Sequence, residues 1–496
     1  MKKLLIGFLA VGLIMGFAMT ASAQPNLKAS GQLYMYGSYA DNQKMTKDGD
    51  SRANIGNRLR MQFEVQVQEG LKLTTRFDAL ERAWGQNQVV GGAQAGEKNI
   101  SWERAYVTFN ALYGVFDVGY KQSRVWGTCA FCDDYDSDAG ISYRYMMGPW
   151  TFGANWDKRG NWSEMKDPNL NGATAIGEGS LQSTNSGLRT LNELGGTDND
   201  HDVYQIYGIY RWATGQAGLR FEMERDAANG KIQSGGSNAA LAPYGFWNAT
   251  RTDAWVATFY EIAPYVQWIS GPFALEGEFR YVWGKVQYDD TGATALIPDV
   301  DRKGWDLYLM GKYTMGAFYG GLEFVYISGD DPSTADKNEA GQTGGGGWDP
   351  LLMFGNYWFL KYQGALGNVS WLSNQTSAAN RTDANTFTVG EYETNMIMFK
   401  PFVGWKVNPQ LEIVAQFAWL RADEKPRVGS NPAGAQFVSD DYGREFDIYA
   451  TYKLYNNLSY TVGFGYFWTG DYFKGTNAAI QVDDNYLVMN ALNFVF

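Results

Sequence analysis

The sequence predicts a transmembrane antiparallel β-barrel of the all-β class, with about eighteen strands and a range of about sixteen to twenty strands. Three observations predict this fold. Apolar and polar residues alternate over long runs, tight turns alternate with long polar loops, and the chain begins with an export signal. Barrels of this kind carry short periplasmic turns at one end and long extracellular loops at the other.

Alternation with a period of two recurs along the chain. Residues 57–68 read NRLRMQFEVQVQ, residues 218–225 read GLRFEMER, and residues 444–455 read REFDIYATYKLY. In an extended strand each of these stretches has one polar face and one apolar face. A soluble sandwich alternates as well, but its strands usually hold about 5–6 residues. The longer runs here match a tilted membrane-spanning strand of about 9–11 residues.

The connections between these strands are alternately short and long. Long polar loops, among them residues 158–200, 227–252 and 329–391, separate the hairpins. Within the hairpins, tight turns contain Gly, Pro or Asn, the residues that set turn dihedrals, and lie at residues 68–71, 110–114, 146–150, 212–216, 269–273, 314–318, 407–410 and 454–458. These hairpins, with a first strand near 27–39 and a last strand at 485–496, give the predicted number of strands.

Aromatic residues stand beside several of the turns, at Tyr113, Trp150, Trp212 and Phe273. They predict an aromatic girdle where the barrel meets the membrane surface. The overall charge is acidic, with 41 basic and 53 acidic residues and a net charge of −12. A nucleic-acid partner is excluded because it would need a basic surface.

Both ends of the chain carry signals of export and assembly. Residues 1–23 are predicted to be a secretory signal peptide, with a basic start, an apolar run and small residues before the cut, which leaves residues 24–496 as the barrel. Leu492, Phe494 and Phe496 share one face of the last strand. This ending resembles the C-terminal strand of Gram-negative outer-membrane proteins. The resemblance implies an outer-membrane location, contact with lipid and lipopolysaccharide, and recognition of Phe496 by the barrel-assembly machinery.

The third long loop from the N-terminus, after 41–53 and 84–98, is predicted at residues 122–139 and contains all but the last residue of CAFCDDYDSDAG, residues 129–140. In general porins, which this pattern resembles, the third loop commonly folds into the lumen. The resemblance implies a constriction in which acidic loop residues face basic wall residues, and charged rings of this kind tune which ions pass. The acidic set is Asp133, Asp134, Asp136 and Asp138, and the basic set is Arg58, Arg60, Arg76, Arg104 and Arg144. The alternative is that these are solvated lumen residues without a special role.

The same stretch favours a disulfide over a metal site. Cys129 and Cys132 predict a disulfide outside the cytosol; zinc would need two more ligands, and the chain has no other cysteine and a single histidine. Calcium is a weak candidate, because Asp134, Asp136 and Asp138 have the right spacing but the following Gly and bidentate Glu are missing. We therefore expect no cofactor. The histidine, His201, stands between Asp200 and Asp202, which resembles the Asp-His pair of outer-membrane proteases. Those barrels are much smaller and need a second acidic pair, so we expect a polar loop-to-strand junction and no enzyme.

Two segments nearer the C-terminus leave alternatives open. Residues 305–331 and 443–472 resemble the hairpins of alginate-export-type barrels, although acidic residues also point inward there. Residues 344–368 turn apolar after four glycines, which predicts an extra strand pair, a segment in the mouth, or an oligomer contact such as porin trimers use. The expected function is an outer-membrane channel for passive diffusion of ions and small hydrophilic solutes. Alternatives are a substrate-selective polysaccharide-export channel and a barrel that serves a partner protein.

Overall fold

The structure is a computed structural model that describes most of the barrel wall and parts of its loops. The described residues are 25–42, 45, 49, 51–84, 100–160, 200–227, 255–288, 299–334, 336–341, 348–356, 358–359, 395–427 and 434–496, without the side chains of residues 133–136, 160, 255 and 288. The predicted signal peptide and most of the three longest predicted loops lie outside the described residues.

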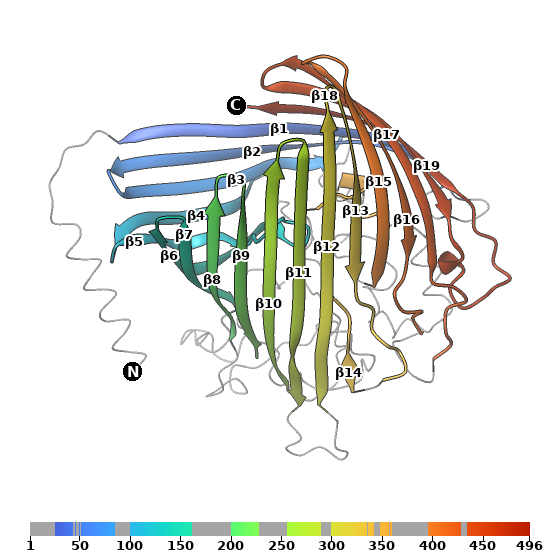
Figure 1. Cartoon of the computed structure of the whole chain (residues 1–496), viewed down its shortest axis with the longest axis horizontal. Helices are drawn as coiled ribbons and strands as arrows, with labels where there is room; N and C mark the ends of the chain where they lie inside the picture. The colour runs from blue at the N-terminus through green and yellow to red at the C-terminus, as the bar shows by residue number, and fades with distance from the viewer. Residues whose placement is uncertain are drawn as a thin grey trace, which may run out of the picture.

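Eighteen long antiparallel strands among the described residues form a closed barrel (Figure 1). Each strand pairs with the next along the chain, and the first pairs with the last over Gln32–Asp41, which closes the sheet. They are β1 (Asn26–Asp41), β2 (Arg52–Gln68), β3 (Leu71–Ala83), β4 (Ile100–Ala111), β5 (Gly114–Arg124), β6 (Asp133–Met147), β7 (Trp150–Gly160), β8 (His201–Trp212), β9 (Gly215–Asp226), β10 (Trp255–Ser270), β11 (Phe273–Tyr288), β12 (Val300–Met315), β13 (Phe318–Ile327), β15 (Met396–Lys406), β16 (Leu411–Arg421), β17 (Asp441–Tyr455), β18 (Leu458–Thr469) and β19 (Asn485–Val495).

The predicted fold class and strand number are confirmed. Strands run from 10 residues in β13 to 17 in β2, so each is long enough to cross a bilayer at a tilt. A further two-residue strand, β14 (Lys337–Asn338), pairs with β12 in parallel and does not belong to the barrel wall. A short 3₁₀ turn, η4 (Asp471–Lys474), follows β18. No helix among the described residues is long and apolar enough to cross a membrane.

All eight predicted turns join neighbouring strands of the barrel. Gly148, Gly271 and Gly316 stand first in two-residue turns and have φ angles of 58°, 56° and 61°. A type II′ turn needs a positive φ at that position, and glycine adopts it without steric cost. The turn residues therefore fix the register of these hairpins.

The two faces of the wall differ as the alternation predicts. Outward side chains are large and apolar, and Ile269 and Leu275 expose 64% and 47% of their surface. Aromatic rings collect beside the short turns, where Phe318 and Trp405 stack with centroids 5.7 Å apart. Many inward side chains are polar or charged, as at Glu445 on β17, which is fully buried, and others, such as Met398 on β15, are apolar and buried. This is the distribution of a barrel with lipid outside and a polar lumen inside.

The third outside loop is shorter than predicted. It spans residues 125–132, because β5 continues to Arg124 and β6 already begins at Asp133. Residues 133–139 were expected in the loop because they are rich in aspartate. A polar run is compatible with a barrel strand when alternate residues face the lumen, and Asp138 pairs in register with Lys121 of β5.

Candidate functional site

The third loop (residues 125–132) extends from β5 and β6 across the barrel interior to β10 and β11. The Trp126 indole Nε1 donates a hydrogen bond to the Ala263 carbonyl oxygen of β10 over 2.9 Å. The same ring packs edge-on against Tyr265 and Tyr207, with centroids 5.1 and 5.5 Å away. All three wall residues lie on inner faces, so the loop is inside the barrel.

Glu278 of β11 is the main polar anchor of the third loop. Its Oε2 accepts hydrogen bonds from the Thr128 backbone N–H at 2.7 Å and from the Thr128 hydroxyl at 2.8 Å. Gly127 has a φ of 62°, and a Cβ there would lie 2.3 Å from the same oxygen, so only glycine allows this approach. Beside it, Arg280 donates to the Phe131 carbonyl oxygen over 2.9 Å.

The two cysteines lie in the second half of the third loop, with Cys132 directly before β6. Their Cα atoms are 4.6 Å apart, within the range of a disulfide. A bridge across so short a ring would stabilise the fold by about 2 kcal/mol, so its effect would fall on the shape of the loop. Ala130 and Phe131, between the cysteines, are buried.

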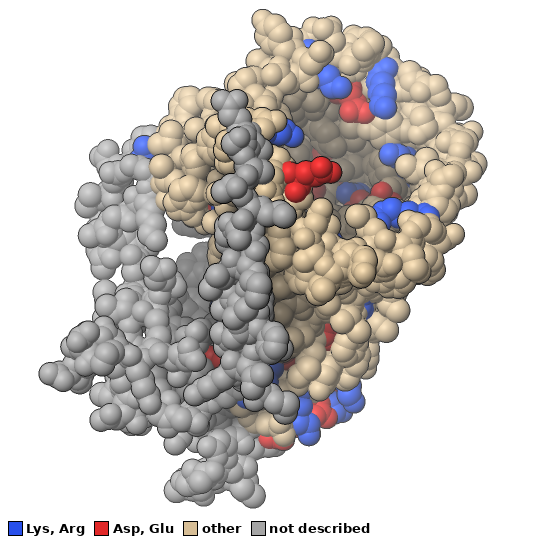
Figure 2. All heavy atoms as spheres, turned by 90° about the vertical axis from the view of Figure 1, so that its left-hand side faces the viewer, with Lys and Arg blue, Asp and Glu red and all other residues tan. Residues whose placement is uncertain are grey.

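A network of buried ion pairs covers the wall beneath the third loop. Glu261 of β10 lies 2.5 Å from Arg220 of β9 and 2.9 Å from Arg280 of β11. Farther round the wall, Arg159 of β7 lies 3.0 Å from Glu224. Figure 2 shows an opening into the molecule whose inner surface carries both basic and acidic side chains. Pairing of this kind holds charges of both signs at fixed positions on the lumen wall.

Asp138 does not meet the predicted arginines. It accepts a hydrogen bond from the Ser123 hydroxyl at 2.7 Å and lies 3.3 Å from Arg159. The predicted pairing is therefore wrong for Asp138, because it belongs to a strand and its described cation partner, Arg159, is on the next strand. The side chains of Asp133, Asp134 and Asp136 lie outside the described residues.

The predicted arginines lie on inner faces of the wall, but their described partners are carboxylates of neighbouring strands. Arg60 holds Asp78 with two hydrogen bonds of 2.7 and 2.6 Å, and Arg58 lies 3.9 Å from the same carboxylate. Arg76, opposite Arg104 on β4, lies 3.9 Å from Glu103. Near a short turn, Arg144 lies 2.9 Å from Asp117.

Sequence reasoning missed Arg159, Arg220 and Arg280, although each stands on the polar face of an alternating strand. Their positions on the polar faces of these strands could have identified them as lumen residues. Asp134, Asp136 and Asp138, the weak calcium candidate, occupy alternate positions of β6 and so do not form a calcium-binding loop.

His201, at the start of β8, contributes to the wall. Its Nε2 lies 2.6 Å from Glu224 Oε1, and Glu224 also contacts Arg159. The histidine therefore joins the ion-pair network on the inner face.

A second segment also crosses the interior. We call residues 348–356 and 358–359 the lumen segment. The backbone N–H groups of Met353 and Phe354 donate to the two carboxylate oxygens of Glu445, at 2.8 and 3.0 Å. Leu352 N–H donates to Asp447 at 3.1 Å, and the Lys400 ammonium donates to the Pro350 carbonyl oxygen at 2.8 Å. One part of the segment is thus attached to β15 and β17.

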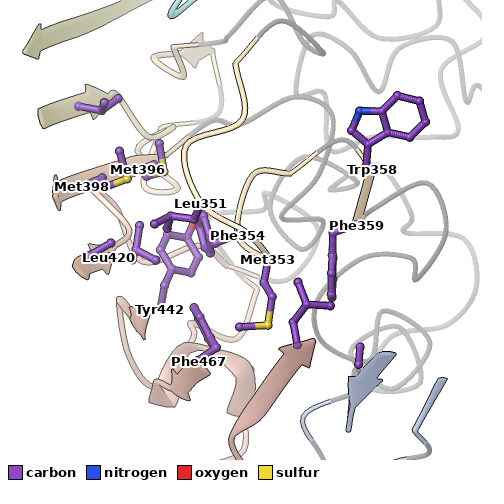
Figure 3. Close-up of a cluster of buried hydrophobic side chains, with 14 of the residues drawn as sticks. Leu351, Met353, Phe354, Trp358, Phe359, Met396, Met398, Leu420, Tyr442 and Phe467 are labelled. Atoms are coloured by element: carbon purple, nitrogen blue, oxygen red, sulfur yellow. The ribbon is translucent and has the colours of Figure 1, made fainter. Parts of the chain in front are cut away.

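The other part of the lumen segment reaches β1 and β2. The Trp358 ring packs on Tyr34 and Tyr36 with centroids 4.5 and 6.3 Å away, and Arg58 lies 4.9 Å above it. Figure 3 shows Leu351 and Phe354 among Met398, Leu420 and Tyr442, with Trp358 apart from them.

For residues 344–368 the sequence left three alternatives: an extra strand pair, a segment in the mouth, or an oligomer contact. The described residues of this stretch form a segment inside the barrel. Ala130 and Phe131 of the third loop belong to the same buried apolar cluster as the lumen segment. The two inward segments therefore pack together inside the barrel.

Asp330, in the loop after β13, makes the stability of that loop depend on pH. Burial raises the pKa of Asp330 to about 7 from an ordinary 3.8, the nearby Glu339 carboxylate raises it further, and a hydrogen bond from the Glu339 N–H at 3.0 Å opposes the shift. Because the folded pKa is the higher one, protonated Asp330 favours the folded loop. This stabilisation is full below about pH 4 and is lost as the pH rises through about 7.

We expect hydrogen exchange at the Glu339 amide, corrected for its intrinsic rate, to show less protection at pH 8 than at pH 6. The variant Asp330→Asn keeps an oxygen acceptor without the charge and should remove the difference. Equal pH dependence in both proteins would contradict the assignment to Asp330.

Comparison with known proteins gives two family matches. A model described as Gram-negative porin matches residues 10–405, and a model described as alginate export matches residues 373–486. No curated protein matches the chain.

Solved structures resemble the chain in fold at low sequence identity. Pseudomonas aeruginosa OccK8 (OprE) is 11% identical, with 95% of this chain and 98% of that chain covered and a TM-score of 0.47. The anion-selective porin from Comamonas acidovorans is 11% identical, with 95% and 100% covered and a TM-score of 0.40. The trimer form of OmpT from Vibrio cholerae is 9% identical, with 96% and 100% covered and a TM-score of 0.39.

Proposed function

The chain belongs to the Gram-negative porin family, and we propose that it passes ions and small hydrophilic solutes through the outer membrane by a lumen that its third loop narrows. One observation carries this proposal. The third loop leaves the wall at β5 and β6 and is anchored at Glu278 of β11, on another part of the wall. A loop held in this way lies across the path of any solute that diffuses through the barrel.

The charge at this constriction comes from the wall. Residues 125–132 read VWGTCAFC and contain no charged side chain. The loop therefore occupies space in the lumen without adding charge, and the paired charges of the wall face it. Because both signs are present and paired, we propose a narrow channel with weak preference between cations and anions.

The outer face of the barrel supports a proposal for its membrane contacts, its assembly and its oligomeric state. Phe494 and Phe496 stack with centroids 5.3 Å apart at the end of the chain. We propose that this aromatic end is the assembly signal, that lipid and lipopolysaccharide contact the outer apolar surface, and that the barrel assembles as a homotrimer. A disulfide between Cys129 and Cys132 and the absence of catalytic activity are part of the same proposal.

A selective polysaccharide channel is the second candidate, favoured by the alginate-export match at residues 373–486. Within that stretch, the inner face carries the carboxylates of Glu412, Glu445 and Asp447. These groups would oppose a polyanion in the lumen. Passive diffusion of small solutes therefore has the better support.

Single-channel recording in a planar bilayer under a salt gradient tests the proposal. We expect stable open steps and a small reversal potential. Changing Asp133, Asp134, Asp136 and Asp138 together to Asn should shift the reversal potential toward anion selectivity if these residues line the path. Current block by alginate oligomers would favour the polysaccharide channel. A folded barrel without conductance would contradict the open channel and favour a barrel that a partner fills.

A further inference from the structure

A cavity of about 480 Å³ lies between the lumen segment and the wall. Its wall side is formed by inner faces of β1, β2, β17, β18 and β19, and its cover by Asp349, Leu352, Asn356 and Trp358 of the lumen segment. It is distinct from the third loop, whose wall contacts lie on β8, β10 and β11. Its volume falls within the range of about 300–1,000 Å³ of small-molecule sites.

Aromatic rings line part of the cavity and are held in place by packing. Tyr34, Trp358 and Tyr449 all contribute to its lining. Trp358 packs on two neighbouring wall residues, Tyr34, 4.5 Å away, and the guanidinium of Arg58, 4.9 Å away. Rigid rings offer flat apolar surface at little cost in conformational freedom.

The rest of the lining is rich in neutral hydrogen-bonding groups. Thr451 and Thr461 bring hydroxyls that lie 2.9 Å apart on β17 and β18. Gln32 on β1 and Asn356 on the lumen segment add side-chain amides; Gln32 donates to Asn493, and Asn356 donates to the Leu351 carbonyl oxygen and accepts from the Phe359 N–H. Hydroxyls and amides both donate and accept, so they suit a ligand that carries many hydroxyl groups.

The charges of the cavity balance one another. Arg60 is held by Asp78 in two hydrogen bonds, and Arg58 lies 3.8 Å from Glu81. On the opposite side the exposed carboxylate of Asp349 lines the cavity. With both guanidiniums beside carboxylates, the cavity has no excess of positive charge that would select an anion.

We propose that this cavity binds a neutral saccharide of one or two rings on its way through the channel, an inference that rests on the proposed channel function. The aromatic surfaces take the apolar faces of the sugar rings, and the hydroxyl and amide side chains take the ring hydroxyls. The lumen segment, which supplies Trp358, Asn356 and Asp349, thereby belongs to the solute path.

The test measures maltose binding by titration calorimetry to the full-length barrel in lauryldimethylamine oxide, a detergent without a sugar headgroup. We expect saturable binding with a dissociation constant in the millimolar range. The double variant Thr451→Val, Thr461→Val removes both hydroxyls together, so no single partner is left unpaired, and should weaken binding about tenfold. Trp358→Ala should weaken it further. Trp419→Ala, at a ring that faces outward on β16, should leave binding unchanged.

Three results would overturn the proposal: no saturable maltose binding, tighter binding of the anion glucuronate, or equal binding in the wild type and the double Val variant. Binding in detergent does not depend on conduction. A barrel that conducts in the bilayer but does not bind maltose would therefore overturn this inference alone. A barrel that binds maltose but does not conduct would overturn the channel function alone.

Discussion

Replacing Glu278 by alanine should widen the channel. The carboxylate accepts both hydrogen bonds that Thr128 gives to the wall, and hydrogen bonds to a charged group contribute about 1.5–3 kcal/mol each. Without them the third loop still has its described contacts at Trp126, Ala130 and Phe131. We expect the single-channel conductance to rise about twofold or more and the open-channel noise to increase.

Two further variants isolate the role of this anchor. Glu278→Gln keeps one oxygen acceptor and should give an intermediate conductance. Glu276→Ala removes a carboxylate from the same inner face of β11, two residues nearer the short turn, and should change the conductance little. If Glu276→Ala and Glu278→Ala raise the conductance equally, the effect comes from wall charge, and the anchoring role is refuted.

The barrel wall could be predicted because its signals are local. Side chains that alternate between lipid and lumen leave a period of two in the sequence, as in the strands that carry Arg58 and Glu445. Positive φ at Gly148 or Gly271 marks a turn that only a few residues accept. Each feature depends on residues within one hairpin, so no knowledge of distant partners was needed.

The third loop could be predicted only in part. Its position followed from counting hairpins, and its inward course was an implication of the porin resemblance. Its limits were wrong because aspartates such as Asp138 suggest a loop in soluble proteins, whereas a barrel accepts them on the lumen side of a strand. Glu278, its main anchor, lies 150 residues away from Thr128 along the chain, and nothing near either residue indicates their contact.

The lumen segment illustrates the same limit. Its apolar residues were compatible with a strand, an inserted segment or a contact surface. The distinction depends on Glu445, which is 92 residues from Met353 and accepts its backbone N–H. The contact between a buried carboxylate and backbone amides so far away in the chain can be recognised only in the three-dimensional structure.

The largest effect should come from replacing Glu445 by alanine. The two backbone amides of Met353 and Phe354 would stay buried without acceptors, at about 1–3 kcal/mol each. The lumen segment should then leave β17. We expect higher conductance than for Glu278→Ala, because this segment lies inside the barrel and contacts the wall from β17 to β1. Chymotrypsin should also cut after Phe354, a residue that is buried in the wild type.

Two comparisons separate release of the lumen segment from damage to the barrel. Glu445→Gln leaves one carbonyl oxygen for one of the two amides and should fall between wild type and Glu445→Ala. Glu412→Ala removes a carboxylate from the inner face of β16 and should keep wild-type conductance and protease resistance. The unheated Glu445→Ala protein should migrate on a gel as a folded barrel, because the wall pairs of β17 with β16 and β18 remain. A folded variant with wild-type conductance and no cleavage would show that Glu445 does not hold the segment in place.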